Sequence, residues 1–182
     1  MWILLGVVLV VAGLWMIVIT GAFPIFYSNP SSPAKTHYEF DFILVYEFNA
    51  QEVTVKDSIV CEYDGVKRLG TAGNKRKWKS YIKSSGSERI VLADIGALDY
   101  VNDFGEAITE LVFDYGNAEF YMGDNGNGGV FPAQNLDYVS YLSVMADGNT
   151  RYNDIPAEEA YEKFGVRLIS WECDPPIKNT FK

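Results

Sequence analysis

Basic residues are in the minority in this chain of 182 residues, which has 15 Lys and Arg against 24 Asp and Glu and a formal net charge of -9. General nucleic-acid binding needs a net basic surface that displaces the counterions of the phosphates, so this composition argues against it. Histidine is also scarce: His37 is the only one, and a single imidazole cannot form a His-rich metal site. We therefore expect no metal, no cofactor and no nucleic-acid partner.

Charged side chains are absent from residues 1–22, where Thr20 is the only clearly polar residue. At a rise of about 1.5 Å per residue, about 20 apolar residues cross a hydrocarbon core of about 30 Å. Pro24 follows the apolar run and favours a helix end, because proline has no backbone N–H to donate. The sequence therefore predicts a single transmembrane helix within residues 1–27, which would anchor the chain in a lipid bilayer.

A cleaved signal peptide is the competing interpretation of this segment. Signal peptides have a basic first region, a short apolar region and a small-residue cleavage site, whereas residues 1–27 contain no Lys or Arg and have a longer apolar run. Lys35, the first basic residue after the run, favours a cytoplasmic domain under the positive-inside rule. Because β-rich domains on such anchors are more often exported, we expect a single-pass protein of the cell membrane with an extracytoplasmic domain. A cytosol-facing regulatory domain is the alternative.

Alternation of apolar and polar residues predicts a β-rich globular domain over residues 37–182, joined to the anchor by an extended, solvated linker over residues 28–36. In residues 38–48 every second residue is apolar, which is the period of a strand with one buried face. Further strands are expected at residues 52–63, 77–83, 89–93, 110–115, 118–122, 138–145 and 166–173, and short helices at 157–164 and 97–104.

This pattern of elements predicts a mainly β fold. Many short strands with few helices are typical of two packed antiparallel layers or of one strongly bent sheet. We expect an N-terminal transmembrane helix followed by an antiparallel β-sandwich-like or bent-sheet domain with one or two short helices.

Basic residues concentrate between positions 67 and 89, where Glu88 is the only acidic residue. In a strand over residues 75–83, alternate side chains would place Lys77, Lys79 and Lys83 on one face and Trp78 on the other. Such a face near a bilayer would bind an anionic lipid, a cell-wall polymer or a membrane protein. The alternative is a solvated edge strand whose lysines prevent edge-to-edge pairing. The candidate binding residues are Lys75, Arg76, Lys77, Lys79 and Lys83.

The two cysteines, Cys61 and Cys173, lie in predicted strands from opposite ends of the domain. Their separation is unlike the C-x-x-C spacing of zinc and redox motifs. If the domain is exported and the two strands are adjacent, a disulfide between them would contribute about 4–5 kcal/mol in the chain-entropy model. Two buried free thiols that behave as small hydrophobic side chains are the alternative.

A glycine-rich loop at residues 123–129 contains Asp124, Asn125 and Asn127. Hard cations bind several oxygen ligands, usually including a bidentate Glu, whereas this loop offers one carboxylate. We expect a flexible turn here.

Three stretches of the domain carry a resemblance to known proteins: YEFDF at 38–42, TVKDSIVCEYDG at 54–65 and RKWKSYI at 76–82. They resemble small, uncharacterised, single-span membrane-anchored β-domain proteins of Gram-positive bacteria. The resemblance implies an anchored β-domain and brings no known activity, so it assigns no functional residue.

No catalytic motif accompanies these features, so we expect no catalytic residues and a membrane-anchored, extracytoplasmic binding or accessory module. An exported hydrolase that uses Asp and Glu residues from separate loops is the alternative, since carboxylates are plentiful. A concave pocket holding two carboxylates within about 5–10 Å of each other would favour the hydrolase, and a convex surface with a continuous basic patch would favour binding.

Overall fold

The structure is a computed structural model that describes residues 28–69, 73–126 and 129–182. The predicted transmembrane helix falls in residues 1–27, outside the described residues, so the anchor stays a prediction. Within the described ranges, no helix is long and apolar enough to cross a membrane.

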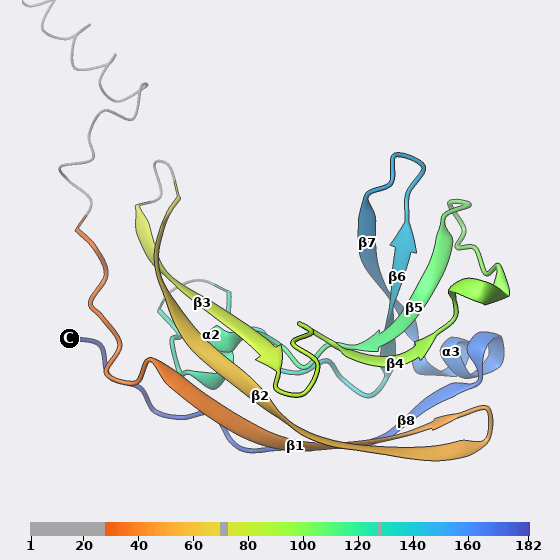
Figure 1. Cartoon of the computed structure of the whole chain (residues 1–182), viewed down its shortest axis with the longest axis horizontal. Helices are drawn as coiled ribbons and strands as arrows, with labels where there is room; N and C mark the ends of the chain where they lie inside the picture. The colour runs from red at the N-terminus through yellow and green to blue at the C-terminus, as the bar shows by residue number, and fades with distance from the viewer. Residues whose placement is uncertain (1–27, 70–72, 127–128) are drawn as a thin grey trace, which may run out of the picture.

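The first sheet has four antiparallel strands in the order β3-β2-β1-β8. Its strands are β1 (His37–Phe48), β2 (Gln51–Arg68), β3 (Asn74–Ile82) and β8 (Val166–Cys173). β1 and β2 form a long hairpin whose two turn residues, Asn49 and Ala50, both have positive φ, as a two-residue hairpin turn of this hand requires. The sheet is strongly curled, and β1 and β2 run along most of the molecule (Figure 1).

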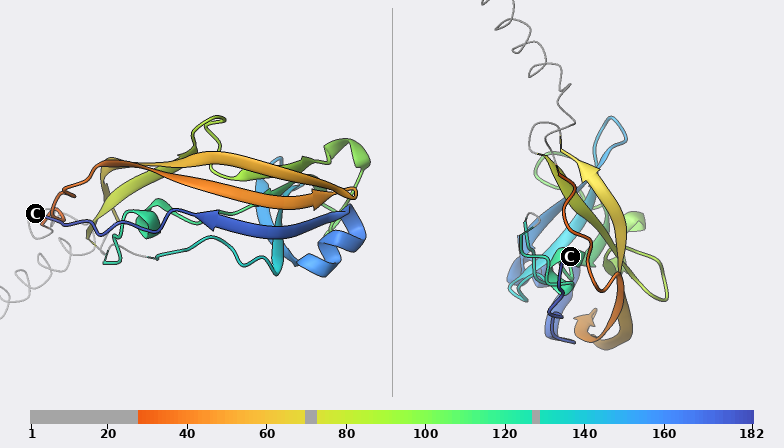
Figure 2. Two further views of the ribbon diagram at one scale, coloured as in Figure 1. Left: turned by 90° about the horizontal axis from the view of Figure 1, so that it is seen from below. Right: turned by 90° about the vertical axis from the view of Figure 1, so that its left-hand side faces the viewer.

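The second sheet is shorter and has the order β4-β5-β6-β7, again antiparallel. It contains β4 (Ile90–Asp94), β5 (Ala107–Phe113), β6 (Tyr138–Val144) and β7 (Thr150–Pro156). Three short helical segments complete the described chain: η3 (Gly96–Leu98), α2 (Ala118–Tyr121) and α3 (Ala157–Phe164). Figure 2 shows α3 and η3 at one end of the molecule and the C-terminus at the other.

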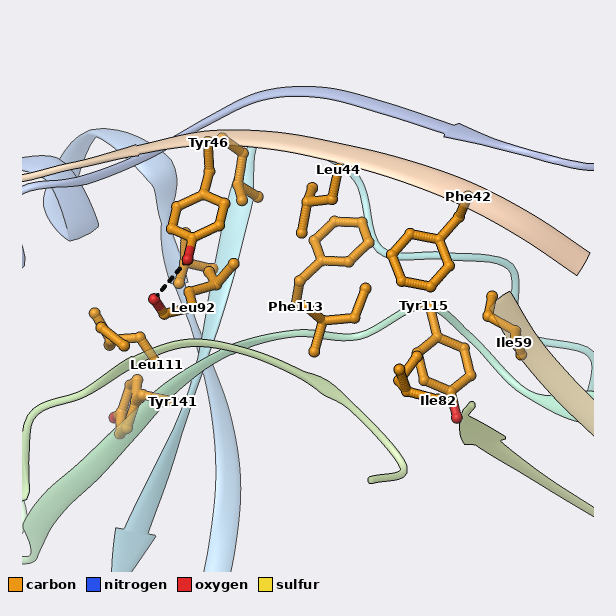
Figure 3. Packing of buried hydrophobic residues seen from close by; sticks show 14 of the residues in the cluster. Phe42, Leu44, Tyr46, Ile59, Ile82, Leu92, Leu111, Phe113, Tyr115 and Tyr141 are labelled. Atoms are coloured by element: carbon orange, nitrogen blue, oxygen red, sulfur yellow. Dashed lines mark hydrogen bonds between the residues drawn. The ribbon is translucent and has the colours of Figure 1, made fainter. Parts of the chain in front are cut away.

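The core lies between the concave side of the first sheet and the second sheet. The alternation in β1 buries Phe40, Phe42, Leu44 and Tyr46, as the sequence predicted. Tyr46 spans the two sheets, because its hydroxyl donates a 2.9 Å hydrogen bond to the backbone oxygen of Leu92 in β4 (Figure 3). This hydrogen bond satisfies the polar tip of the buried phenol ring.

Trp171 of β8 forms a second link between the sheets. Its ring lies 5.1 Å from that of Phe42 in β1 and 4.8 Å from that of Phe113 in β5, in tilted contacts. Aromatic pairs at such distances stabilise a core beyond the area that they bury. The long strands and the short sheet are therefore joined through aromatic side chains.

The two ends of the described chain pair with each other. We call residues 29–35 and 179–182 the terminal ribbon. The N–H of Ala34 donates to the oxygen of Thr180 at 2.8 Å, and the N–H of Lys182 donates to the oxygen of Ser32 at 2.9 Å. Pro33 is buried between them. The segment expected to be an extended, solvated linker is extended and mostly exposed, and its backbone pairs with the C-terminal residues.

The mainly β fold with antiparallel sheets and few helices is confirmed. Residues 118–122 were predicted as a strand, and this is wrong: they contain α2, which Asn117 caps by accepting the N–H of Phe120 at 3.1 Å. The strand β7 was not predicted, because most of its side chains are polar and exposed and show no apolar alternation.

Candidate functional site

The outer face of β3 and the residue after it carry three of the lysines that the sequence singled out, and these three are paired with carboxylates. Lys77 Nζ lies 2.5 Å from Asp64 Oδ2 and Lys79 Nζ lies 3.3 Å from Glu62 Oε2, both on β2. Lys83, just after β3, reaches Glu39 of β1 at 2.6 Å. The predicted division of side chains between the two faces is confirmed for these lysines and for the buried Trp78.

This pairing changes the electrostatics of the face. The hydrogen bond from Lys79 lowers the pKa of Glu62, and that from Lys77 lowers the pKa of Asp64. The hydrogen bond to Glu39 raises the pKa of Lys83. Cations and anions therefore alternate over the outer sides of β1, β2 and β3. The basic residues between positions 67 and 89 thus lie in a surface of mixed charge, because the neighbouring strands β1 and β2 contribute carboxylates from outside this segment.

Arg76 lies on the opposite face of β3 from Lys77 and is part of the interior. Its guanidinium donates two hydrogen bonds to Asp124, from Nε at 2.7 Å and from Nη2 at 2.6 Å. Trp78 Nε1 donates to the same carboxylate at 2.8 Å. Asp124 is fully buried, with 0% of its surface exposed. Three donors thus balance one buried charge, which is the condition under which a buried carboxylate is tolerated.

The same arginine holds the terminal ribbon. Arg76 Nη1 donates to the backbone oxygen of Ser31 at 3.1 Å, and the Phe181 ring lies 4.1 Å from the guanidinium carbon. Asp124 was expected to lie in a flexible turn, but its burial and its three hydrogen bonds show a structural residue. Arg76, proposed from sequence as a binding residue, is therefore engaged inside the domain.

Lys75, the remaining candidate, lies at the end of the β2–β3 hairpin. In the register of the two strands it faces Lys67, and the next pair is Arg68 and Asn74. None of the ion pairs among the described residues involves Lys67 or Lys75. Asn74 Nδ2 also donates to Asn29 Oδ1 at 2.8 Å, so this hairpin end adjoins the start of the described chain.

Both cysteines are free thiols in the structure. Cys61 is on β2 and Cys173 is on β8, and β1 lies between these two strands, so the strand adjacency that the predicted disulfide requires is missing. Burial raises the pKa of the Cys61 thiol to about 12 and that of Cys173 to about 11. Thiols of such high pKa are weak nucleophiles at neutral pH.

A cleft of about 750 Å³ runs along β3. One wall is β3 itself, from Lys77 to Ser80. The other wall comes from segments 114–119 and 131–134, which pair through hydrogen bonds from Asn117 N–H to the Phe131 oxygen (2.9 Å) and from Gln134 N–H to the Asp114 oxygen (2.8 Å). We call this cavity the β3 cleft.

The backbone of β3 faces this cleft with unpaired groups. β3 is an edge strand, and the Lys83 N–H donates to the Ser58 oxygen on β2. In an antiparallel ladder, residues that hydrogen-bond to the neighbouring strand alternate with residues that do not. The register therefore makes the backbone N–H and C=O groups of Tyr81 and Lys79 bond to β2, and it directs those of Ser80 and Trp78 away from β2. Ile82 follows this rule, since its N–H and C=O bond to Ser87 and Gly86 outside the ladder.

Acidic groups outnumber basic groups in the β3 cleft. Its lining contains the carboxylates of Asp64, Glu88, Asp114, Glu119 and Asp154, and the cations of Lys77, Lys79 and Arg89. Asp64 pairs with Lys77, and Asp114 lies 3.6 Å from Arg89, whose guanidinium stacks 3.7 Å from the Tyr152 ring. Among the described residues no ion pair reaches the other three carboxylates.

Glu119 is a cleft carboxyl whose pKa is raised. Burial raises its pKa, and the charge of Asp124 adds to the effect. The neighbouring Asp154 accepts a 2.5 Å hydrogen bond from Ser140 Oγ. A carboxyl whose pKa is raised by burial is a feature of general acids.

A smaller cavity of about 280 Å³ lies between the loop after η3 and α3. Tyr100 packs edge-on against Phe164 there, with 4.8 Å between the ring centroids, and Phe104 at the rim of the cavity is 76% exposed.

The single histidine, His37, lies outside both cavities. Its Nδ1 is 3.4 Å from Glu62 and its Nε2 is 3.8 Å from Glu39. In the described ranges no group of three or more His, Cys, Asp or Glu residues is placed to hold a metal.

Comparisons of this chain with protein families, with curated proteins and with solved structures find no match. The assignment of a site therefore depends on the geometry of the chain itself. That geometry favours the β3 cleft, which sequence reasoning missed. Segments 114–119 and 131–134 have no motif, and they meet β3 only in the folded chain.

Proposed function

We propose that this protein is a membrane-anchored, extracytoplasmic binding module that holds its partner in the β3 cleft. The observation that carries the proposal is a cleft of about 750 Å³ bordered by the free edge of β3, with polar and charged side chains converging on it. Concave sites of this size with a few convergent polar groups are the usual location of binding in proteins.

The ribbon and hairpin support a fixed placement of the domain at the bilayer. The proposed anchor, residues 1–27, precedes the terminal ribbon, which Arg76 contacts through the Ser31 oxygen and the Phe181 ring. The hairpin end with Lys67 and Lys75 adjoins Asn29. Cations at this position favour contact with anionic headgroups, each contributing about 1 kcal/mol near the surface.

A photo-crosslinking pair tests binding in the cleft. Benzoylphenylalanine replaces Phe131, at the rim of the β3 cleft, or Phe104, at the rim of the smaller cavity; both rings are exposed, 64% and 76%. In the native membrane, position 131 is expected to give a discrete adduct and position 104 none. Equal labelling from both positions, or adducts from 104 alone, would reject the β3 cleft as the binding site.

Protease shaving of intact cells tests the orientation. A tag placed after Lys182 is expected to be lost from intact cells, because the proposal puts the domain outside. Protection of the tag until lysis would place the domain in the cytosol and redirect the search to inner-leaflet lipids and cytosolic partners. The anchor itself is tested by alkaline extraction, which should leave the full chain in the membrane pellet.

An exported carboxylate-dependent hydrolase is the second candidate. The observation in its favour is a cleft lined by several carboxylates, among them Glu119, whose pKa burial raises, as the pKa of a general acid is raised. Labelled casein and purified cell-wall fragments are suitable substrates. Release of soluble label by the full chain and none by Glu119→Gln would support hydrolysis, and no release by either would leave binding as the function.

A further inference from the structure

We propose that the β3 cleft takes an extended peptide segment that carries a basic side chain and that adds to the free edge of β3 as a further strand. This inference rests on the proposed function, because it names the class of partner for the same cleft. It is carried by three observations on the described residues: an open strand edge, lysines that leave this edge accessible, and unpaired carboxylates on the walls.

The open edge consists of backbone groups of known direction. The register and the Lys83–Ser58 hydrogen bond turn the N–H and C=O of Trp78 and Ser80 away from β2. No other described strand pairs with β3 on that side, and both residues line the cleft. A segment of extended backbone satisfies such groups without any particular side chain, which is the basis of peptide binding by strand addition.

Lysines on an edge strand usually prevent this kind of pairing. Here, however, Lys77 and Lys79 form ion pairs with Asp64 and Glu62, which belong to the neighbouring strand β2. Their ammonium groups are thus bound to carboxylates of β2. The edge is left open by the same ion pairs that neutralise the lysines.

The cleft has a second wall, which faces the free edge of β3. Segments 114–119 and 131–134 enclose the cleft, and Gly116 allows their close approach: a Cβ at this position would lie 2.4 Å from the Phe131 oxygen. Gly116 also has φ of +94°, which other residues rarely adopt. A bound strand would therefore lie in a groove between β3 and this wall, not on an open surface.

The charge of the walls selects the side chain. Glu88, Glu119 and Asp154 line the cleft without an ion-pair partner among the described residues, while the cleft lysines are already paired. A Lys or Arg of the bound segment would supply the missing cation, and the net charge of -9 would attract it from a distance. An acidic segment would meet only carboxylates and paired cations.

Selection from a library tests the class of partner. The full chain, in nanodiscs of phosphatidylcholine, is presented with random heptapeptides displayed on phage. The expected result is enrichment of heptapeptides that share a Lys or Arg at one position. Enrichment of sequences without a basic residue, or no enrichment at all, would overturn the inference.

Two substitutions at one position test strand addition. Ser80→Pro removes the edge N–H together with the serine hydroxyl and leaves the ladder to β2 intact, since position 80 does not bond to β2, and proline is tolerated on edge strands in this orientation. Ser80→Ala keeps the N–H and is the matched control. The selected peptide should bind Ser80→Pro about tenfold more weakly than wild type and Ser80→Ala about equally.

A change in the peptide gives the same test independently of the folding of any variant. N-methylation of the peptide backbone at alternate residues should weaken binding about tenfold in one register and little in the other. Equal binding of both methylated forms would overturn strand addition.

The role of the carboxylates is tested in parallel. Glu119→Gln should weaken the peptide about tenfold, as expected for loss of a hydrogen bond between charged groups, and Glu52→Gln, exposed on β2, should leave binding unchanged. Equal affinity of the two variants would remove Glu119 from the site. If benzoylphenylalanine at position 131 crosslinks a partner while no basic heptapeptide is selected, the proposed binding function is supported and the assignment of a basic peptide is rejected.

Discussion

The two faces of β3 use the same kind of residue for opposite purposes. On the inner face Arg76 donates to a carboxylate that is fully buried, and Trp78 completes the set of donors. On the outer face Lys77 and Lys79 pair with exposed carboxylates of β2. Neighbouring basic residues of one strand thus lie in different environments, one buried and the others exposed. We therefore expect them to contribute differently to the free energy of unfolding.

This difference shows why charge in a sequence is not the same as charge available for binding. A buried ion pair cannot be broken cheaply, because the remaining charge loses both water and partner. An exposed pair contributes little and exchanges readily with solvent or ligand. The inner face of β3 is therefore structural, and we propose that the edge between the two faces binds a partner.

The largest expected effect is on the inner face. Asp124→Asn leaves Arg76 buried without its counter-charge, so the free energy of unfolding should fall by about 3–5 kcal/mol. Urea unfolding followed by circular dichroism measures this loss. Asp147→Asn, in an exposed turn beside Asn149, is the control and should change stability little. Similar losses for both variants would contradict the structural role of Asp124.

A smaller effect is expected at the next residue of the inner face. Trp78→Phe keeps an aromatic ring against Tyr63 but removes the indole N–H that donates to Asp124. Because that hydrogen bond involves a charged acceptor, its loss should cost about 1.5–3 kcal/mol. The same urea titration applies, and no change would mean that Arg76 alone satisfies the carboxylate.

On the outer face the expected effect is close to zero. The double variant Lys77→Gln and Lys79→Gln should change the free energy of unfolding by less than about 1 kcal/mol, and the change should shrink further in high salt. A loss of unfolding free energy as large as that expected for Asp124→Asn would contradict the difference between the two faces.

The smallest effect is the pH dependence at Glu119. Burial raises the pKa of this carboxyl in the folded state, so the protonated form favours folding, fully below the unfolded pKa of about 4.3. This contribution is lost as the pH rises through the folded pKa. Glu119→Gln should therefore be slightly more stable than wild type at pH 7, and the difference should decrease on acidification. A difference that grows in acid would contradict the sign of the shift.

Sequence patterns predicted the elements whose side chains alternate between core and solvent. β1 is the clearest case, since the burial of Phe40, Phe42, Leu44 and Tyr46 matches the spacing in the chain. The strand β7 was not predicted, because its residues are mostly polar and it forms a strand through its pairing with β6. α2 was predicted as a strand because it has only four residues, too few for a helical period, and its cap Asn117 was not recognised.

The candidate site could be predicted only in part. The opposite faces of Lys77 and Trp78 follow from local periodicity. The partners of these residues do not, because Asp64, Glu62 and Asp124 come from other segments and meet β3 through long-range pairing. The same holds for Glu119 and for the other residues that face the free edge across the β3 cleft.

Amide hydrogen exchange resolved for individual residues of β3 tests the central claim most directly. In the free protein, the amides of Trp78 and Ser80 should exchange faster than those of Lys79 and Tyr81, which bond to β2. On binding of a selected basic heptapeptide, protection should rise at Trp78 and Ser80 and stay constant at Lys79 and Tyr81. Binding that leaves the exchange of Trp78 and Ser80 unchanged would contradict strand addition at the edge of β3.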